Sequence, residues 1–278
     1  SPSTRASIAK LASGTTRQRV TRKNLEELSV PLPPLEEQRR IVVKLEDHLS
    51  RLDIALAEVN ATEQRIETFK NSILEKYLFS SVVEHETKLK DLGKWVTGST
   101  PSSTNPLYRG EEVPFVTPGD ISYGGSVETV ARRISELGAN QVRRIPGPSM
   151  QLVCIGATLG KVGWSRESVT TNQQITSLVP SEDVIDVRYA TFLFSSPSIQ
   201  SALWNASSST TVPILNKGTL ENMSVRIPKI KDQLAAVSDI DSHFQHFEKA
   251  RIEAANASRL IKHARFSLLE KAFTKGID

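Results

Sequence analysis

Hydrophobic residues recur at the spacing of a long amphipathic helix in residues 36–79, a stretch that contains neither Gly nor Pro. Steps of four and three residues separate the apolar positions, which is the a/d pattern of a coiled coil. Pro33 and Pro34 come just before it, where an extended chain can lead into a helix. The pattern predicts one helix roughly 65 Å long, at 1.5 Å per residue. Its apolar seam consists of Leu45, Leu49, Leu52, Leu56, Val59, Ile66 and Ile73, with polar interruptions at Glu63 and Lys70.

A second stretch without Gly or Pro, residues 231–275, repeats the pattern more weakly. Its seam positions are Ile240, Phe244, Phe247, Arg251, Ala254, Ile261 and Leu268. Because a whole domain separates the two stretches, we expect the two helices to pair as an antiparallel coiled coil whose seam residues also support partner proteins. The alternative is two separate amphipathic helices, each covering a globular core.

The chain contains an internal repeat with an offset of 195 residues. Residues 14–38 align with residues 209–233 without gaps, and the same register continues some forty residues later. Chance does not keep one register over so long a span, so the chain is built on two copies of one unit. Identical pairs include Thr15/Thr210, Leu25/Leu220, Glu26/Glu221, Ser29/Ser224, Pro33/Pro228, Gln38/Gln233, Ser72/Ser267 and Leu74/Leu269.

Between the two helical stretches the composition changes, with more Gly, Pro, Ser and Thr and shorter apolar runs. Four runs predict strands, and residues 187–204 predict a helix or a pair of helices broken near Pro197. The fold class is therefore α+β, with one mixed domain flanked by two long helices. The strands are expected at residues 113–118, 151–156, 174–180 and 223–228. The expected divisions are 1–34, the remnant of a first such domain; 35–82, the first long helix; 83–228, the complete domain; and 229–278, the second long helix.

Composition narrows the function classes only slightly. The net charge of +4 and the pI near 9.1 favour a polyanionic partner weakly, since residues 83–228 carry 13 Lys/Arg and 13 Asp/Glu. Residues 1–34 carry six basic residues against two acidic ones. A single cysteine, Cys154, excludes a disulfide framework and favours the cytoplasm. No apolar run is long enough to cross a membrane, and the start at Ser1 suggests that an upstream portion is missing.

The motifs that resemble catalytic or metal sites are incomplete. Residues 156–161 (GATLGK) are one residue short of a phosphate loop, and Val162 stands where Ser or Thr would bind magnesium. We expect a glycine turn between strands there, offering N–H groups and one lysine to phosphate. Asn105-Pro106-Leu107-Tyr108 lacks the second proline of the adenine methyltransferase motif and predicts a turn. His243 and His246 have no third ligand nearby, and we expect both to face away from the helix interface. The chain is predicted to be no enzyme and to hold no metal or cofactor.

Several sequence segments, in the order in which they occur along the chain, resemble those of the specificity (S) subunits of type I restriction-modification systems. Residues 92–121 (LGKWVTGSTPSSTNPLYRGEEVPFVTPGDI) are similar to the start of the family's target recognition domain, and residues 155–163 and 171–175 resemble two later blocks. Residues 30–45 (VPLPPLEEQRRIVVKL) resemble the entry to the family's conserved helix, and residues 226–237 are its degenerate second copy. The resemblance covers nearly the whole chain.

The resemblance implies a DNA-recognition subunit without catalysis of its own. Two recognition domains would each read one half of a bipartite double-stranded DNA site. The helices would act as a ruler and as the dock for two methyltransferase (M) subunits and a restriction (R) subunit, with S-adenosylmethionine and ATP/Mg on those partners. Here only one recognition domain is complete, which implies a truncated form or a half-subunit whose homodimer would read a palindromic site.

Polar loops of residues 83–228 supply the candidate DNA contacts, because Asn and Gln pair with adenine and Arg and Lys with guanine or phosphate. The candidates are Thr100, Arg109, Thr117, Asp120, Tyr123, Thr158, Lys161, Asn172 and Gln173, with Arg17 and Arg19 expected on phosphate. Asn172 and Gln173 have an alternative role, which is to satisfy buried backbone in a turn. Competing functions are a stand-alone DNA methyltransferase or nuclease, and a coiled-coil adaptor with a protein- or glycan-binding head.

Overall fold

The computed structural model describes residues 2–12, 19–26, 28, 32–79, 86–122, 124–208 and 211–274. The chain divides into two compact units. One consists of residues 1–68 and 247–278, and the other, which we call the recognition unit, consists of residues 69–246. Both units contain part of each long helix.

The two long helices are α3 (Leu35–Phe79) and α8 (Ile230–Thr274), each of 45 residues. Both the first and the last residues of the two helices differ by 195 positions, which is the offset of the sequence repeat. Glu36 and Glu37 lie in the first turn of α3, where acidic side chains favour the positive end of the helix dipole. The predicted helices and their register are confirmed.

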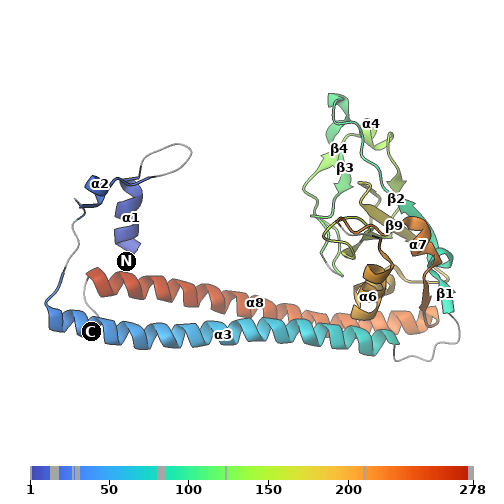
Figure 1. Cartoon of the computed structure of the whole chain (residues 1–278). Coiled ribbons are helices and arrows are strands. Elements are labelled where there is room, and N and C mark those ends of the chain that lie inside the picture. The colour runs from blue at the N-terminus through green and yellow to red at the C-terminus, as the bar shows by residue number, and fades with distance from the viewer. Residues whose placement is uncertain are drawn as a thin grey trace. The chain divides into compact units, whose positions relative to one another are not determined.

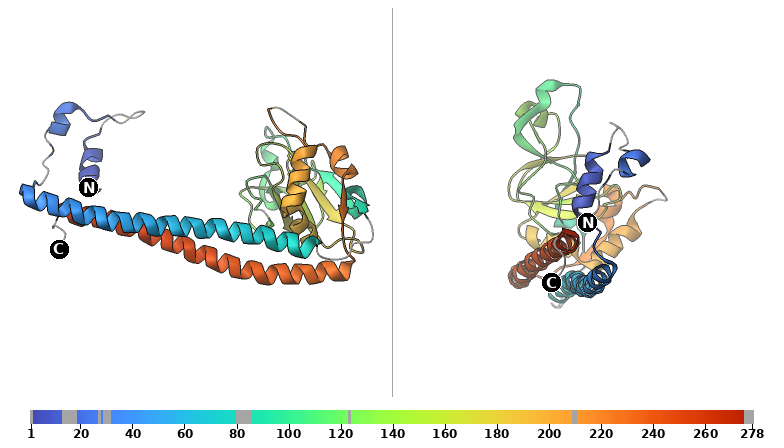
Figure 2. Two further views of the ribbon diagram at one scale, coloured as in Figure 1. Left: turned by 60° about the horizontal axis from the view of Figure 1, so that its bottom comes forward. Right: turned by 90° about the vertical axis from the view of Figure 1, so that its left-hand side faces the viewer.

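Within the first unit, α3 and α8 run side by side (Figures 1 and 2). The start of α3 packs against the end of α8, because Ile41 and Leu45 form a buried cluster with Ala272. Asp53 and Arg265 make an ion pair across the same two helices. The short helices of this unit are α1 (Pro2–Lys10) and α2 (Arg22–Glu26).

Within the recognition unit, the end of α3 packs against the start of α8. Leu74 and Leu78 share one buried cluster with Ala236 and Ile240. Ala236 and Ile240 are the repeat equivalents of Ile41 and Leu45, so the two units use equivalent residues for equivalent contacts. In both units the helices are antiparallel, as the position of the intervening domain predicts.

One expectation for the helices is wrong. His243 does not face away from the helix interface: its Nε2 lies 3.1 Å from the hydroxyl oxygen of Tyr77, and the two rings are 5.5 Å apart. Because a half-buried imidazole needs a polar partner, the tyrosine hydroxyl lets His243 sit at the interface.

Two four-stranded sheets and a two-stranded ribbon form the body of the recognition unit, which confirms its mixed α+β class. The first sheet has the order β2-β9-β6-β7, the second has the order β4-β3-β8-β5, and β1 pairs with β10. All of these pairs are antiparallel except β3 and β8, which are parallel. The strands are β1 (Glu86–Lys88), β2 (Gly93–Thr97), β3 (Arg109–Val116), β4 (Arg133–Ile134), β5 (Arg144–Ile145), β6 (Ser149–Val153), β7 (Val162–Ser165), β8 (Val169–Thr171), β9 (Ile175–Pro180) and β10 (Ser224–Arg226).

Short helices cover these sheets, and the predicted break near Pro197 is present. It separates α5 (Val187–Ser195) from α6 (Pro197–Ala206). The remaining helices are η1 (Leu89–Leu92), η2 (Pro106–Tyr108), α4 (Glu136–Ala139) and α7 (Lys217–Asn222). No helix among the described residues is long and apolar enough to cross a membrane.

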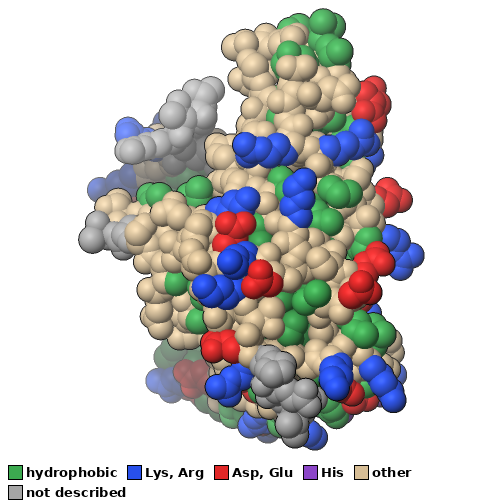
Figure 3. Space-filling view, turned by 90° about the vertical axis from the view of Figure 1, so that its right-hand side faces the viewer, with side chains coloured by type: hydrophobic (Ala, Val, Ile, Leu, Met, Phe, Trp, Pro, Cys, Tyr) green, Lys and Arg blue, Asp and Glu red, His purple; other side chains and the backbone are tan. Residues whose placement is uncertain are grey.

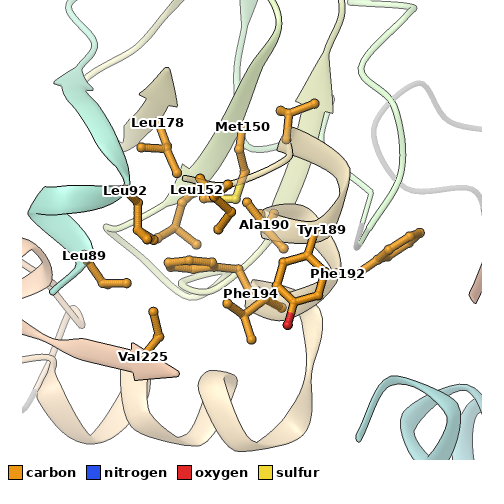
Figure 4. Packing of buried hydrophobic residues seen from close by; sticks show 14 of the residues in the cluster. Leu89, Leu92, Met150, Leu152, Leu178, Tyr189, Ala190, Phe192, Phe194 and Val225 are labelled. Carbon is orange, nitrogen blue, oxygen red and sulfur yellow. The ribbon is translucent and has the colours of Figure 1, made fainter. Parts of the chain in front are cut away.

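The main core lies between the first sheet, α5 and the ends of the long helices (Figure 4). Phe194 of α5 lies beside Leu152 and Leu92 in this view, and Tyr189 is fully buried. The Tyr189 hydroxyl donates to the carbonyl oxygen of Leu78 at 3.2 Å, which satisfies its one polar atom and joins α5 to α3.

Polar contacts join the recognition domain, which is residues 83–228 of the recognition unit, to the start of α8. Arg188 makes a two-pronged ion pair with Asp241, and its guanidinium also lies over the rings of Trp164 and Phe192. Gln233 is fully buried; its amide nitrogen donates to the carbonyl oxygens of Val184 and Pro228, and its oxygen accepts from Asp186 N.

Candidate nucleic-acid interface

The carboxyl ends of β3 and β8 meet because the two strands are parallel, with Val116 beside Thr171. The chain segments that leave these ends are residues 117–120 and 172–174. Asn172 N donates to Val116 O at 3.3 Å, which holds the two segments together. Four of the predicted DNA-contacting residues (Thr117, Asp120, Asn172 and Gln173) therefore lie on neighbouring loops.

Asp120 organises the first of these loops. Its carboxylate accepts hydrogen bonds from Thr117 N at 2.8 Å, Thr117 Oγ1 at 2.7 Å and Ala131 N at 2.8 Å. Burial by itself raises the pKa of Asp120, but these three hydrogen bonds outweigh it and hold the pKa below its usual 3.8. Asp120 is thus ionised at neutral pH, and its oxygens are engaged by the protein.

Asn172 and Gln173 differ in what they can do. Asn172 is half-buried and exchanges hydrogen bonds with Gln174: its oxygen accepts from the backbone N–H at 3.1 Å, and its amide nitrogen donates to Oε1 at 2.9 Å. This arrangement matches the turn-stabilising alternative for Asn172. Gln173 is exposed, and its Oε1 accepts from Thr100 Oγ1 at 2.8 Å, whereas its amide nitrogen has no hydrogen-bond partner among the described residues.

The loop after β2 reaches this site through a close backbone approach at Gly98. A Cβ atom on Gly98 would lie 2.3 Å from the carbonyl oxygen of Asn172, so no larger residue fits. Ser99 N also donates to Thr171 O at 2.9 Å. These contacts place Thr100 next to Gln173, so an exposed hydroxyl and an exposed amide form one polar surface.

The predicted glycine turn lies between β6 and β7, as expected. Gly160 has a φ of +90°, which favours glycine. The N–H groups of Gly156, Leu159, Gly160 and Lys161 donate to backbone carbonyls, so the fold itself uses most of the turn's donors. Lys161 is half-buried, and its ammonium donates to Pro118 O at 3.3 Å, which joins this turn to the Asp120 loop. Thr158 is exposed at the tip.

The remaining candidates lie elsewhere. Arg109 is exposed at the first residue of β3, so the length of the strand separates it from Thr117. The preceding Asn105 accepts a hydrogen bond from Leu107 N at 3.1 Å and starts η2, which confirms the predicted turn. Arg19 is exposed in the first unit. Tyr123 and Arg17 lie outside the described residues.

Two pairs of adjacent arginines near the site were missed by the sequence analysis. Arg132 lies over the ring of Phe115, 4.8 Å from its centroid, and Arg133 donates to the carbonyl oxygens of Glu111 and Glu112 at 2.6 Å. The second pair, Arg143 and Arg144, flanks the loop after β2. The sequence did contain a signal for these residues, because two Arg-Arg dipeptides stand out in a domain with no net charge.

The following apolar residues, which were predicted for the helix seam and for partner support, are all buried or half-buried. Leu45, Ile66 and Ile240 are buried. The others are half-buried, namely Leu49, Leu52, Leu56, Val59, Phe244, Phe247 and Ile261. Among the described residues, no group of three His, Cys, Asp or Glu side chains could hold a metal ion.

Comparison with known proteins gives consistent matches. The family model of the type I restriction modification DNA specificity domain matches residues 5–64 and 83–257. The chain is 23% identical to the type I restriction enzyme EcoBI specificity subunit of Escherichia coli, covering 94% of this chain and 61% of that protein. It is 32% identical to the HindI specificity subunit of Haemophilus influenzae over 50% of this chain and 31% of that protein. The chain thus spans less than two thirds of the curated relatives it matches.

Solved structures share the fold. A chain from a study of complex assembly and conformational transition of the type I R-M system superposes with a TM-score of 0.77 at 20% identity, covering 95% of this chain and 66% of that one. The HsdS subunit from Thermoanaerobacter tengcongensis gives a TM-score of 0.56 at 20% identity, over 100% of this chain and 68% of that one. Given the family-model match over most of its length, the chain belongs to the family of type I restriction-modification DNA specificity domains.

Proposed function

We propose that this chain is a non-catalytic DNA sequence-recognition subunit of a type I restriction-modification complex. The observation that carries the proposal is the meeting of polar loops at the ends of β3 and β8, in a domain attached to a pair of matched 45-residue helices. Side chains such as Gln173 and Thr100 are exposed there on a support fixed by internal hydrogen bonds, which readout of base edges requires.

The helices have the properties of a scaffold for other subunits. α3 and α8 bury one stripe against each other and leave large apolar side chains exposed on their other faces. Exposed apolar residues of this kind favour contacts with other proteins. In the proposed complex, methyltransferase and restriction subunits bind these helices in the cytoplasm and carry S-adenosylmethionine, ATP and magnesium. The exposed residues include Val43, Ile54, Ile252, Leu260 and Phe266.

A second recognition domain is part of the proposal, because equivalent residues of the two repeats differ in exposure. Leu220 and Val237 are 0% and 7% exposed, whereas their equivalents Leu25 and Val42 are both 50% exposed. A second domain, from the same polypeptide or from another copy of this chain, would cover the exposed pair. Two domains would then read the two halves of one bipartite site, which would be palindromic in a homodimer.

The decisive experiment is a bandshift of the full chain against a random duplex DNA library, with and without its methyltransferase partner. We expect selection of a bipartite sequence, and no binding of S-adenosylmethionine by the chain alone. Methylation or cleavage by the chain alone would instead support a stand-alone enzyme. Failure to bind DNA even with the partner would support an adaptor with a protein- or glycan-binding head.

The helix role has its own test. Leu52 lies on the half-buried seam of α3, and Leu52→Asp places a charge there. We expect this variant to lose the coiled coil and the methyltransferase partner together in a pull-down. Retention of the partner by Leu52→Asp would contradict the scaffold role.

A further inference from the structure

A basic hollow lies beside the polar loops of the recognition unit. It has a volume of about 650 Å³ and is bordered by the edge strand β2, the segment around β5 and the start of α7. Four cationic side chains and no carboxylate line it, although the domain as a whole carries no net charge. Figure 3 shows Lys and Arg side chains, interspersed with Asp and Glu, on the side of the molecule where β2 and α7 lie. The lining residues are Lys94, Trp95, Val96, Thr97, Arg143, Arg144, Pro146, Val179 and Lys217.

The two arginines are held in place by the fold. Arg143 donates from Nη1 to Thr97 O at 2.7 Å, which ties it to the end of β2. Arg144 contacts Glu136 Oε2 at 3.0 Å and Ser168 Oγ at 3.3 Å. The Arg144 and Glu136 side chains are 46% and 57% exposed, so water screens their attraction and leaves the arginine available to another anion.

The two lysines differ in how they are engaged by the protein. The ammonium of Lys94 has no hydrogen bond or ion pair among the described residues. Lys217 lies 3.5 Å from Glu221 one turn along α7, and because the two side chains are 44% and 31% exposed, water screens their attraction in part. A lysine ammonium on a flexible stem can follow a phosphate oxygen, whereas an arginine fixed by its neighbours presents N–H groups in a set geometry.

The hollow adjoins the polar surface formed by Thr100 and Gln173. Arg143 N contacts Ser99 Oγ at 3.4 Å, and the next residue, Thr100, donates its hydroxyl to Gln173. Cationic side chains thus adjoin the exposed polar groups of Thr100 and Gln173. This is the arrangement that a DNA-reading surface needs, because phosphate contacts fix the register in which bases are read.

We propose that Lys94, Arg143, Arg144 and Lys217 form a clamp for the phosphate backbone of duplex DNA. This inference rests on the proposed function and specifies the face of the domain that meets the duplex. Neutral loops such as those of Thr100 and Gln173 contribute selectivity, and the clamp contributes affinity that does not depend on sequence. Lys161, which the sequence assigned to phosphate contact, then serves mainly to join its turn to the Asp120 loop through Pro118 O.

The test compares the double variant Lys94→Gln/Lys217→Gln with a matched control, Arg226→Gln/Lys229→Gln. The control removes two exposed charges of the same unit outside the hollow. Affinity for the selected duplex is measured against salt concentration, using the full chain with its methyltransferase partner. For the hollow variant we expect about tenfold weaker binding per lysine near 0.1 M salt, and a salt slope lower by about 1.8 for two lost phosphate contacts. The preferred sequence and the unfolding midpoint should remain unchanged, and the control should keep the wild-type slope.

Each other outcome has a definite meaning. A wild-type slope in the hollow variant overturns the clamp while the recognition function stands. A changed sequence preference at the wild-type slope also overturns it, since the lysines would then read bases. Competition by millimolar inorganic phosphate at constant ionic strength would indicate a free-phosphate site and not a DNA clamp. A wild-type complex without affinity for DNA overturns the recognition function and the clamp together.

Discussion

Gln38 and Gln233 make the same hydrogen bond 195 residues apart. Each side-chain amide donates to the carbonyl oxygen of the proline five residues before it, at 2.6 Å for Gln38 and Pro33 and at 2.8 Å for Gln233 and Pro228. Both glutamines thereby fix the entry of the chain into a long helix. Only Gln233 also bonds to the recognition domain, through Val184 O and Asp186 N.

This difference predicts unequal effects of one substitution at the two sites. Gln233→Ala leaves Val184 O and Asp186 N without partners and should destabilise the protein by about 2–4 kcal/mol. Gln38→Ala, at a half-buried position with one such bond, should cost about 1 kcal/mol. Urea unfolding of both variants provides the measurement. Equal losses would show that the contacts of Gln233 to the recognition domain contribute nothing.

The pair of Arg188 and Asp241 is expected to couple the domain to α8. Their side chains are 35% and 28% exposed, so the pair is screened only in part. A double-mutant cycle with Arg188→Met and Asp241→Asn should give a coupling free energy of about 1–2 kcal/mol. The coupling should weaken as salt is raised. A cycle with Arg251 and Glu248, an exposed pair on the surface of α8, is the control and should give about 0.3–0.5 kcal/mol.

Asp120 should stabilise the protein in its ionised form. Because the folded-state pKa is lowered, this stability is present above pH 3.8 and is lost as the pH falls through the folded-state pKa. Asp120→Asn removes part of the acceptor capacity and should cost about 1–3 kcal/mol at pH 7. The difference from wild type should shrink in acid unfolding experiments. Asp91→Asn, at an exposed position, is the control and should change the free energy of unfolding by less than about 0.5 kcal/mol.

The single thiol should be inert in the folded protein. Burial raises the pKa of Cys154 from 9.0 to about 11, against the opposing effect of hydrogen bonds with Thr176. The thiol stays neutral in both states below pH 9, and above it the unfolded chain loses its proton first, so stability falls as the pH rises towards 11. Between a pH well below 9 and pH 10, the free energy of unfolding of the wild type should fall by about 1.4 kcal/mol relative to that of Cys154→Ala. A fast reaction of the native protein with a thiol reagent at pH 8 would contradict this burial.

The helix seam can be tested by matched leucine truncations in α3. Leu45 is 8% exposed and packs within the buried cluster with Ala272, whereas Leu35 is 59% exposed. Leu45→Ala should destabilise the protein by about 2–3 kcal/mol, and Leu35→Ala by less than about 0.5 kcal/mol. Thermal unfolding distinguishes them. Similar small losses would mean that the seam is not packed in solution.

The sequence predicted the fold best where a periodic pattern extended over many residues. The heptad seam and the repeat located both long helices, because helical periodicity is a local property of the chain. The break at Pro197 was predicted because a proline interrupts a helix, which is also a local property of the chain. The strands β1, β2, β4, β5, β7 and β8 were missed, since strands of two to five residues carry little periodic signal and owe their structure to partners distant in sequence.

The candidate site was predicted only in part. The sequence identified the polar loops, but it could not tell which polar atoms the fold would use for itself. Asp120 and Asn172 satisfy backbone groups of the protein, whereas Gln173, one residue further along, is exposed. Arg143 and Lys94 are 49 positions apart and meet in one hollow only because β2 and the segment around β5 fold together.

The sequence by itself determined the two copies, their 195-residue register, the antiparallel helices and the mixed domain between them. These follow from periodicity and connectivity, which the order of residues records directly. The tertiary structure decided which side chains remain for a ligand, because hydrogen bonds between distant loops consume some polar groups and leave others exposed. It also brought Lys94, Arg143, Arg144 and Lys217 together, since the charge of a surface depends on which segments are neighbours in space.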